Sequence, residues 1–139
     1  MHVSARPAVF FVLLAAACGA PAQEGVTESF AALYEDVFVE RGCVKCHDQD
    51  APGGLNMADT QTAYQNLVGA PAAGTKCAPS GMLRVNAGDS AMSLLVHKLE
   101  GHDETEQPVC GKPMPQMESL ATSDIERVRT WIDQGAEDQ

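Results

Sequence analysis

The chain has 139 residues, of which 45% are hydrophobic, and a formal net charge of −10 from nineteen Asp and Glu against nine Lys and Arg. This length allows one compact domain with a core of its own, and the composition argues against disorder. The acidity makes nucleic acid and anionic lipid poor partners; it either favours a partner with a basic docking face or simply keeps the protein soluble.

The N-terminus has the layout of an export signal. An apolar run over residues 8–17 follows a basic start and is too short for a permanent membrane helix. Two cleavage sites compete. A lipobox-type cut that removes residues 1–17 makes Cys18 the lipidated end of a lipoprotein, with a tether over 18–26, whereas ordinary secretion removes residues 1–22. Both predict an exported protein, periplasmic or anchored at the outer membrane, in a compartment that favours disulfides.

Helical periodicity begins soon after this segment. Thr27 is expected to cap a first helix with apolar residues on one face, and Gly42 is expected to end it directly in front of Cys43. Residues 48–57 read as a loop, and a short helix is predicted over 60–67.

The second half of the chain adds two more helices. One is predicted after a cap at Asp89 or Ser90 and ends near Gly101. A long loop follows, and the last helix is predicted from a capping box at Ser123 and Glu126, with its end near Gly135. Since no segment alternates as a strand would, the pattern predicts an all-α domain over 27–139.

The sequence GCVKCHDQD contains a CxxCH motif that can hold zinc, exchange a disulfide or bind haem covalently. A zinc site would need Cys77 and Cys110 to complete its ligands. A thiol oxidoreductase places CxxC after a strand in an alternating βα pattern, which this chain lacks. In covalent haem attachment, Cys43 and Cys46 form thioethers with the vinyl groups, and His47 is the proximal iron ligand. An exported all-α chain favours this last interpretation, with one haem c.

A methionine sulfur is the usual sixth ligand where the iron transfers electrons. Met114 lies between two prolines that restrict its backbone, and we predict that it is the distal ligand, with Met117 as the nearest rival. Packing within a helix accounts for Met92, and Met57 is expected to line the haem pocket as a hydrophobe.

Four other side chains are weaker candidates for contacts with the haem. His97 and His102 offer a bis-histidine alternative, although polar or acidic neighbours favour a solvated side chain for both. Arg84 and Lys112 are candidates to pair a haem propionate, the alternative being a solvated surface charge.

A helix that runs into CxxCH, a late proline-rich Met loop and a closing helix with an aromatic residue together resemble a class I cytochrome c. The resemblance covers residues 27–136. It is closest to short bacterial modules with a GGL turn after the haem motif, here residues 53–55, and an MP dipeptide before the last helix, here residues 114–115. It implies a class I cytochrome c-like fold, all-α, with three to five helices and long loops around one haem.

The resemblance also implies particular contacts around the haem. The first and last helices are expected to cross beside it, through Val37, Phe38 and Gly42 on one side and Val128, Trp131 and Ile132 on the other. A carbonyl in the loop after the motif, such as that of Pro52, is expected to accept the proton on the second nitrogen of His47.

Cys77 and Cys110 lie in a middle segment that simple class I members lack. Because they are the two unassigned cysteines of an exported chain, we predict that they form a disulfide. Its use would be to hold the Met114 loop near the haem.

Three functions remain open at this point. The leading hypothesis is a monohaem c-type cytochrome, not an enzyme, that carries single electrons between extracytoplasmic redox partners. The second is a haem enzyme or a gas- or peroxide-binding module with a labile or absent Met ligand. The third is a bound subunit of a larger redox complex.

Overall fold

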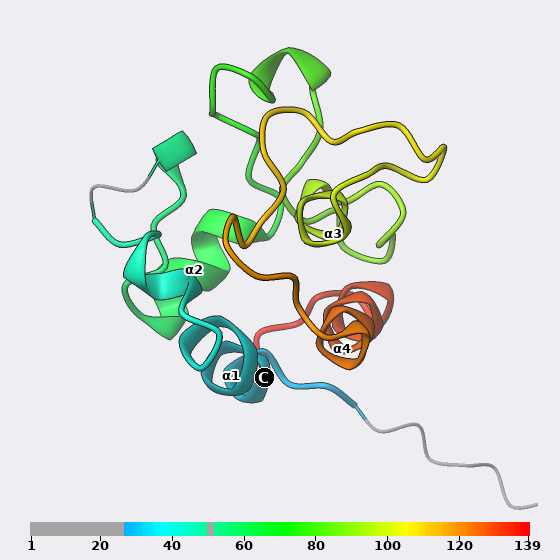
Figure 1. The fold of residues 1–139 in the computed structure, drawn as a ribbon. Helices are drawn as coiled ribbons and strands as arrows, with labels where there is room; N and C mark the ends of the chain where they lie inside the picture. The colour runs from blue at the N-terminus through cyan, green and yellow to red at the C-terminus, as the bar shows by residue number, and fades with distance from the viewer. Residues whose placement is uncertain (1–26, 50–51) are drawn as a thin grey trace, which may run out of the picture.

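A computed structural model describes residues 27–49 and 52–139, so the predicted signal segment, Cys18 and the tether lie outside the described residues. Within these ranges the chain forms four α-helices, joined by long loops with short 3-10 or π-helical turns (Figure 1). The described part of the chain forms no β-strand, and extended segments pair only in isolated bridges. The predicted all-α class is therefore confirmed.

The first helical segment begins at a different cap from the predicted one. Ser29, not Thr27, is the N-cap, and its hydroxyl accepts a hydrogen bond from the Ala32 N–H at 3.2 Å. Helix α1 (Phe30–Leu33) passes directly into a π-helical segment, η1 (Tyr34–Val39). Gly42, at a φ of 76°, ends this segment in front of the CxxCH motif as predicted.

Helix α2 (Thr60–Leu67) has the predicted bounds, and the Asp59 side chain caps it by accepting the Thr62 N–H at 2.8 Å. Helix α3 (Leu94–Glu100) begins later than predicted, with Ser93 as its N-cap. The predicted caps act elsewhere, because Asp89 closes a turn onto the Met92 N–H and Ser90 bonds to Asp133 on the last helix.

Helix α4 (Thr122–Asp133) begins after Ala121, so the predicted capping box of Ser123 and Glu126 is not formed. Ser123 already lies inside the helix. The buried Asp124 carboxylate accepts a hydrogen bond from Arg41 at 2.8 Å, which ties the start of α4 to the end of the first helical segment. The end near Gly135 agrees with the prediction, since the Gly135 N–H bonds to the Ile132 carbonyl at 2.9 Å.

One core joins the first helical segment to α2 and α4. The Phe30 ring lies 5.0 Å from the ring of Trp131 and 5.2 Å from that of Tyr64, measured between centroids. The side chains expected at the crossing of the first and last helices all belong to this core: Val37, Phe38, Val128, Trp131 and Ile132. Gly42 is the exception, because the atoms nearest to its Cβ position belong to Lys45 rather than to α4.

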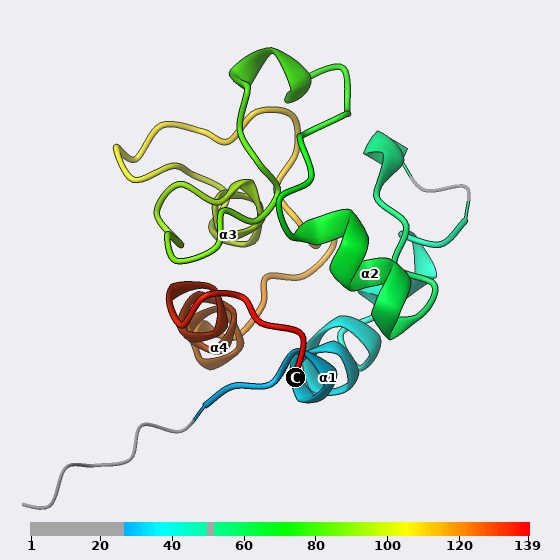
Figure 2. The same cartoon turned by 180° about the vertical axis from the view of Figure 1, so that it is seen from behind.

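The segment after α2 and the loop after α3 lie side by side, as Figures 1 and 2 show from opposite directions. They form the end of the molecule away from the Phe30 core. Among the described residues, no helix has both the length and the apolar character needed to cross a membrane.

Candidate functional site

A mostly apolar cavity of about 300 Å³ lies between the CxxCH turn, the segment after α2, helix α3 and the Met114 loop. This volume is at the lower end of the range for small-molecule and cofactor sites, about 300–1,000 Å³. The wall includes apolar side chains from several elements together with groups of the CxxCH motif: Phe38, Cys43, His47, Leu67, Leu95 and Met114.

The CxxCH motif forms a tight turn at this wall. Gly42 opens the 3-10 segment η2 (Cys43–Lys45), and the carbonyl of Cys43 accepts the His47 N–H at 3.0 Å. Cys43 is half-buried in the cavity wall, whereas Cys46 is exposed, and both carry free thiols. Burial raises the pKa of the Cys43 thiol. The turn thus brings one thiol and the imidazole to the same cavity.

The imidazole of His47 contains a polar atom with no partner. Its Nδ1 is buried without a hydrogen bond in the described structure, so the expected bond to the Pro52 carbonyl is not formed. Burial lowers the pKa of His47, and the charge of Arg84 acts in the same direction, although the backbone of Leu55 opposes the shift. The lowered pKa favours the neutral ring, which is the form that ligates metals.

Met114 lies across the cavity on the loop after α3. Its half-buried side chain contributes to the cavity wall, and its N–H donates to the Lys98 carbonyl at 2.7 Å. The rival Met117 is 99% exposed and does not reach the cavity. Met57 is 2% exposed and lines the cavity as predicted, whereas Met92 is 57% exposed and precedes α3, so its predicted packing within a helix is wrong.

The two remaining cysteines are paired with each other. The sulfurs of Cys77 and Cys110 are 2.15 Å apart, as the predicted disulfide requires. They are therefore not joined to the CxxCH thiols in a four-cysteine zinc site. Among the described residues, no group of three or more His, Cys, Asp or Glu side chains is placed to hold a metal ion.

The predicted histidine alternatives lie outside the cavity wall. His97 is 5% exposed, and its Nε2 donates to the Ala91 carbonyl at 2.7 Å, so the expected solvated side chain is wrong. His102 is half-exposed in the following loop, close to Glu106. Neither residue lines the cavity.

The two predicted propionate partners differ in position. Arg84 lines the cavity and donates to the carbonyls of Asn66 at 2.7 Å and Gly53 at 3.0 Å. Burial lowers the pKa of its guanidinium, and no carboxylate of the described chain pairs with it. Lys112 is exposed, away from the cavity wall, and its amine bonds to Gln116. Of these two residues, Arg84 alone is placed to face an anionic group in the cavity.

Lys98 is a cavity residue that the sequence reasoning missed. Its amine donates to the carbonyls of Cys110 and Lys112, and its side chain lines the cavity. A signal was present in the sequence, because Lys98 follows Leu94 by four residues and Leu95 by three and so shares their helix face.

The groups that could hold a haem here are the two CxxCH thiols, the His47 imidazole and the Met114 sulfur. The cavity is mostly apolar, its charged lining residues are Lys76, Arg84 and Lys98, and no carboxylate of the described residues lines it. This donor set and this lining fit the metal and the apolar ring of such a group. No family model, no curated protein and no solved structure matches this chain.

Proposed function

We propose that the protein is a monohaem c-type cytochrome of class I type that carries single electrons between redox partners outside the cytoplasm. The observation that carries the proposal is that Cys43, His47 and Met114, which come from two distant parts of the chain, line one apolar cavity. Thioether, imidazole and methionine sulfur are the attachments and axial ligands of an electron-transferring haem c.

Each residue has a defined role in this proposal. Cys43 and Cys46 would attach the haem as thioethers, and His47 and Met114 would ligate its iron. The bound haem supplies reversible one-electron chemistry. The surrounding side chains exclude water, and Arg84 offsets the charge of a carboxylate at the cavity edge. Because His47 and Met114 would both ligate the iron, the proposal leaves no iron position for a substrate and does not include catalysis.

The proposal includes the exported state of the chain, with Cys18 lipidated or with residues 1–22 removed. The net charge of −10 favours a redox partner with a basic docking face, because complementary charge accelerates brief encounters. Electron-transfer complexes of this kind are small and short-lived.

The test uses protein matured together with its haem-attachment machinery. Mass spectrometry should report one added haem and no alkylation of Cys43 or Cys46, and the optical spectrum should show six-coordinate low-spin iron with a sulfur-to-iron charge-transfer band. Colourless protein with both thiols open to alkylation would overturn the proposal. High-spin iron that binds carbon monoxide readily would favour a haem enzyme or gas-binding module instead.

The axial ligand is tested with a matched pair of variants. Met114→Ala should abolish the sulfur-to-iron band and lower the midpoint potential, because water or a weaker ligand replaces the thioether sulfur. Met117→Ala removes an exposed methionine three residues away and should leave both properties unchanged. The reverse pattern would transfer the ligand role to Met117.

A further inference from the structure

Lys98 on helix α3 contacts the Met114 loop in two ways. The Lys98 amine donates to the Cys110 carbonyl and, at 2.9 Å, to the Lys112 carbonyl. The Lys98 carbonyl accepts the Met114 N–H at 2.7 Å. Side chain and backbone of one residue therefore hold three points along the segment 110–114.

The contacts of the Lys98 amine are unusual for a lysine. Its side chain is partly buried, and it forms no ion pair with an Asp or Glu within residues 27–49 and 52–139. A partly buried ammonium without a carboxylate is unfavourable unless dipoles replace its water shell. Here the carbonyls of Cys110 and Lys112 take the place of water around the Lys98 ammonium. The charge of Lys98 therefore binds the loop to α3.

The loop backbone is shaped to admit this amine. Gly111 has a φ of 73°, and a Cβ at this position would lie 3.2 Å from the Lys98 Nζ. A side chain there would be strained by the backbone conformation and would crowd the amine. Gly111 therefore allows the loop to wrap the end of the lysine side chain.

The disulfide fixes only the start of the segment that leads to Met114. Cys77 fixes Cys110, but Met114 lies four residues further along, beyond the reach of that covalent bond. Lys98 contacts the intervening stretch from a helix that is itself anchored, because Glu100 on α3 bonds to Arg129 on α4 at 2.8 Å. The contacts of Lys98 thus extend the restraint from the disulfide to the methionine.

We propose that Lys98 is a positioning residue, which sets the strength of the bond between the Met114 sulfur and the haem iron by holding the 110–114 segment against α3. This role rests on the proposed function. It predicts that the loop opens more readily, with release of the sulfur, when the amine is removed. Two hydrogen bonds are lost in that case, so the equilibrium should shift about tenfold to a hundredfold toward the released state.

The experiment compares haem-loaded wild type with Lys98→Met, Lys98→Arg and Lys112→Met. Lys98→Met keeps the chain length and removes the donor, whereas Lys98→Arg keeps a charged donor and should restore most of the wild-type behaviour. Lys112→Met is the matched control, because it removes a positive charge from the same loop but leaves the carbonyl that Lys98 binds. The readouts are the sulfur-to-iron band, the midpoint potential and hydrogen exchange of the Met114 amide.

Lys98→Met should weaken the band, lower the potential and speed exchange at Met114, while Lys112→Met should change none of these. If Lys98→Met does not mature, Lys98→Gln supplies an uncharged amide donor and should give an intermediate loss. A wild-type band that persists unchanged in both Lys98→Met and Lys98→Gln would overturn the positioning role alone. A wild type that carries haem but shows no band would overturn the Met114 ligation itself, and this role with it.

Discussion

At the scale of single residues, the histidines show how different surroundings give the same side chain different properties. Burial lowers the pKa of His47 at the cavity, and its ring is available in the neutral form. His97 is buried and bonded to a backbone carbonyl, which gives it a structural use. His102 is half-exposed, and its pKa is raised by the hydrogen bond to the Asp103 backbone and by nearby carboxylates. Only the first of these environments suits a metal ligand.

His102 provides a pH prediction. Its pKa is raised from 6.5, first by the hydrogen bond to the Asp103 backbone and then by the carboxylates of Glu106, Glu100 and Glu104. A raised pKa contributes stability that is complete below about pH 6.5 and is lost as pH rises through the folded-state value. NMR titration should therefore place His102 above 6.5, and Glu106→Gln should reduce the shift. A His102 that titrates below 6.5 would contradict the arrangement of this loop.

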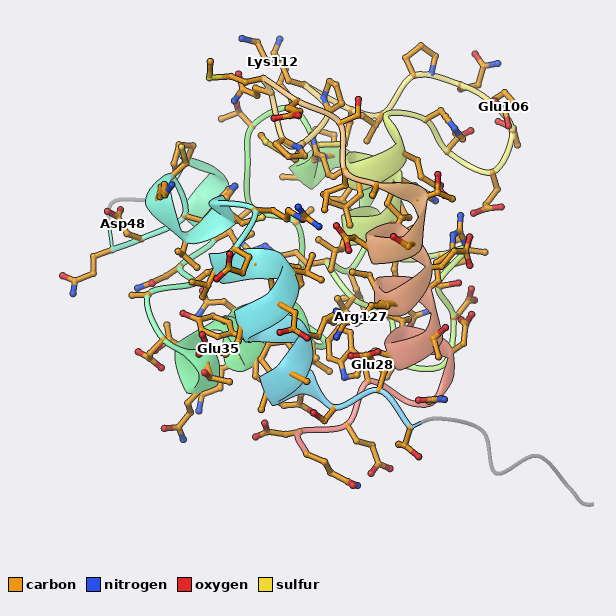
Figure 3. All side chains as sticks on the ribbon, turned by 60° about the horizontal axis from the view of Figure 1, so that its bottom comes forward. Glu28, Glu35, Asp48, Glu106, Lys112 and Arg127 are labelled. Atoms are coloured by element: carbon orange, nitrogen blue, oxygen red, sulfur yellow. A yellow bond between two sulfur atoms is a disulfide. The ribbon has the colours of Figure 1, made fainter. Side chains whose placement is uncertain are left out.

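At the scale of elements, the first helical segment and α4 come from opposite ends of the described chain and pack together in the core. Phe30 packs on Trp131. Outside this aromatic contact, Arg127 bonds to Glu28 at 2.7 Å, and these two side chains lie next to each other in Figure 3. Arg127 also bonds to Asp36 at 3.0 Å. Since η1 leads directly into the CxxCH turn, this packing also fixes where the motif begins.

Phe30→Ala tests this packing. Phe30 is fully buried at the centre of four aromatic contacts, so its truncation should lower the free energy of unfolding by about 3–5 kcal/mol. Denaturant unfolding of the matured protein measures the change. Met92→Ala, at a position that is 57% exposed, is the control and should change stability by about 0.5 kcal/mol or less. Equal effects of the two substitutions would contradict the assigned core.

At the scale of the whole molecule, the buried side chains form two separate clusters. The larger cluster surrounds Phe30 and Trp131, and a smaller one surrounds the disulfide with Leu94 and Val109. The cavity lies between them, since Phe38 of the first cluster and Cys77 of the second both line it. The smaller cluster is therefore expected to stabilise the side of the cavity on which Met114 lies.

Replacement of both Cys77 and Cys110 by Ser tests whether the smaller cluster stabilises the Met114 side of the cavity. The bond links positions 33 apart, so its loss should lower stability by about 3–4 kcal/mol in the chain-entropy estimate. The sulfur-to-iron band of the haem-loaded protein should weaken as well, because the Met114 loop loses its covalent anchor. Thermal unfolding and optical spectra provide the two readouts. An unchanged melting temperature together with an unchanged band would refute the prediction.

Local signals explain which helix boundaries could be predicted. Glycines with positive φ end the first segment, α3 and α4 close to the predicted positions, because few other residues adopt that conformation. N-caps were less predictable. Ser90 fits a cap by residue type, but its hydroxyl bonds to Asp133, and only the folded chain brings these two residues together. A cap depends on which partner the side chain finds, and that partner can lie far along the sequence.

The sequence by itself determined the all-α class, the CxxCH turn that Gly42 opens and the pairing of Cys77 with Cys110. These depend on residue type, short-range spacing and cysteine number. The flanking prolines already favoured Met114 over Met117, and Met114 lines the cavity. Only the tertiary structure decided that His97 is buried and that the Lys98 amine bonds to the loop. Burial and long-range hydrogen bonds arise where distant segments meet, and no local pattern encodes which segments those are.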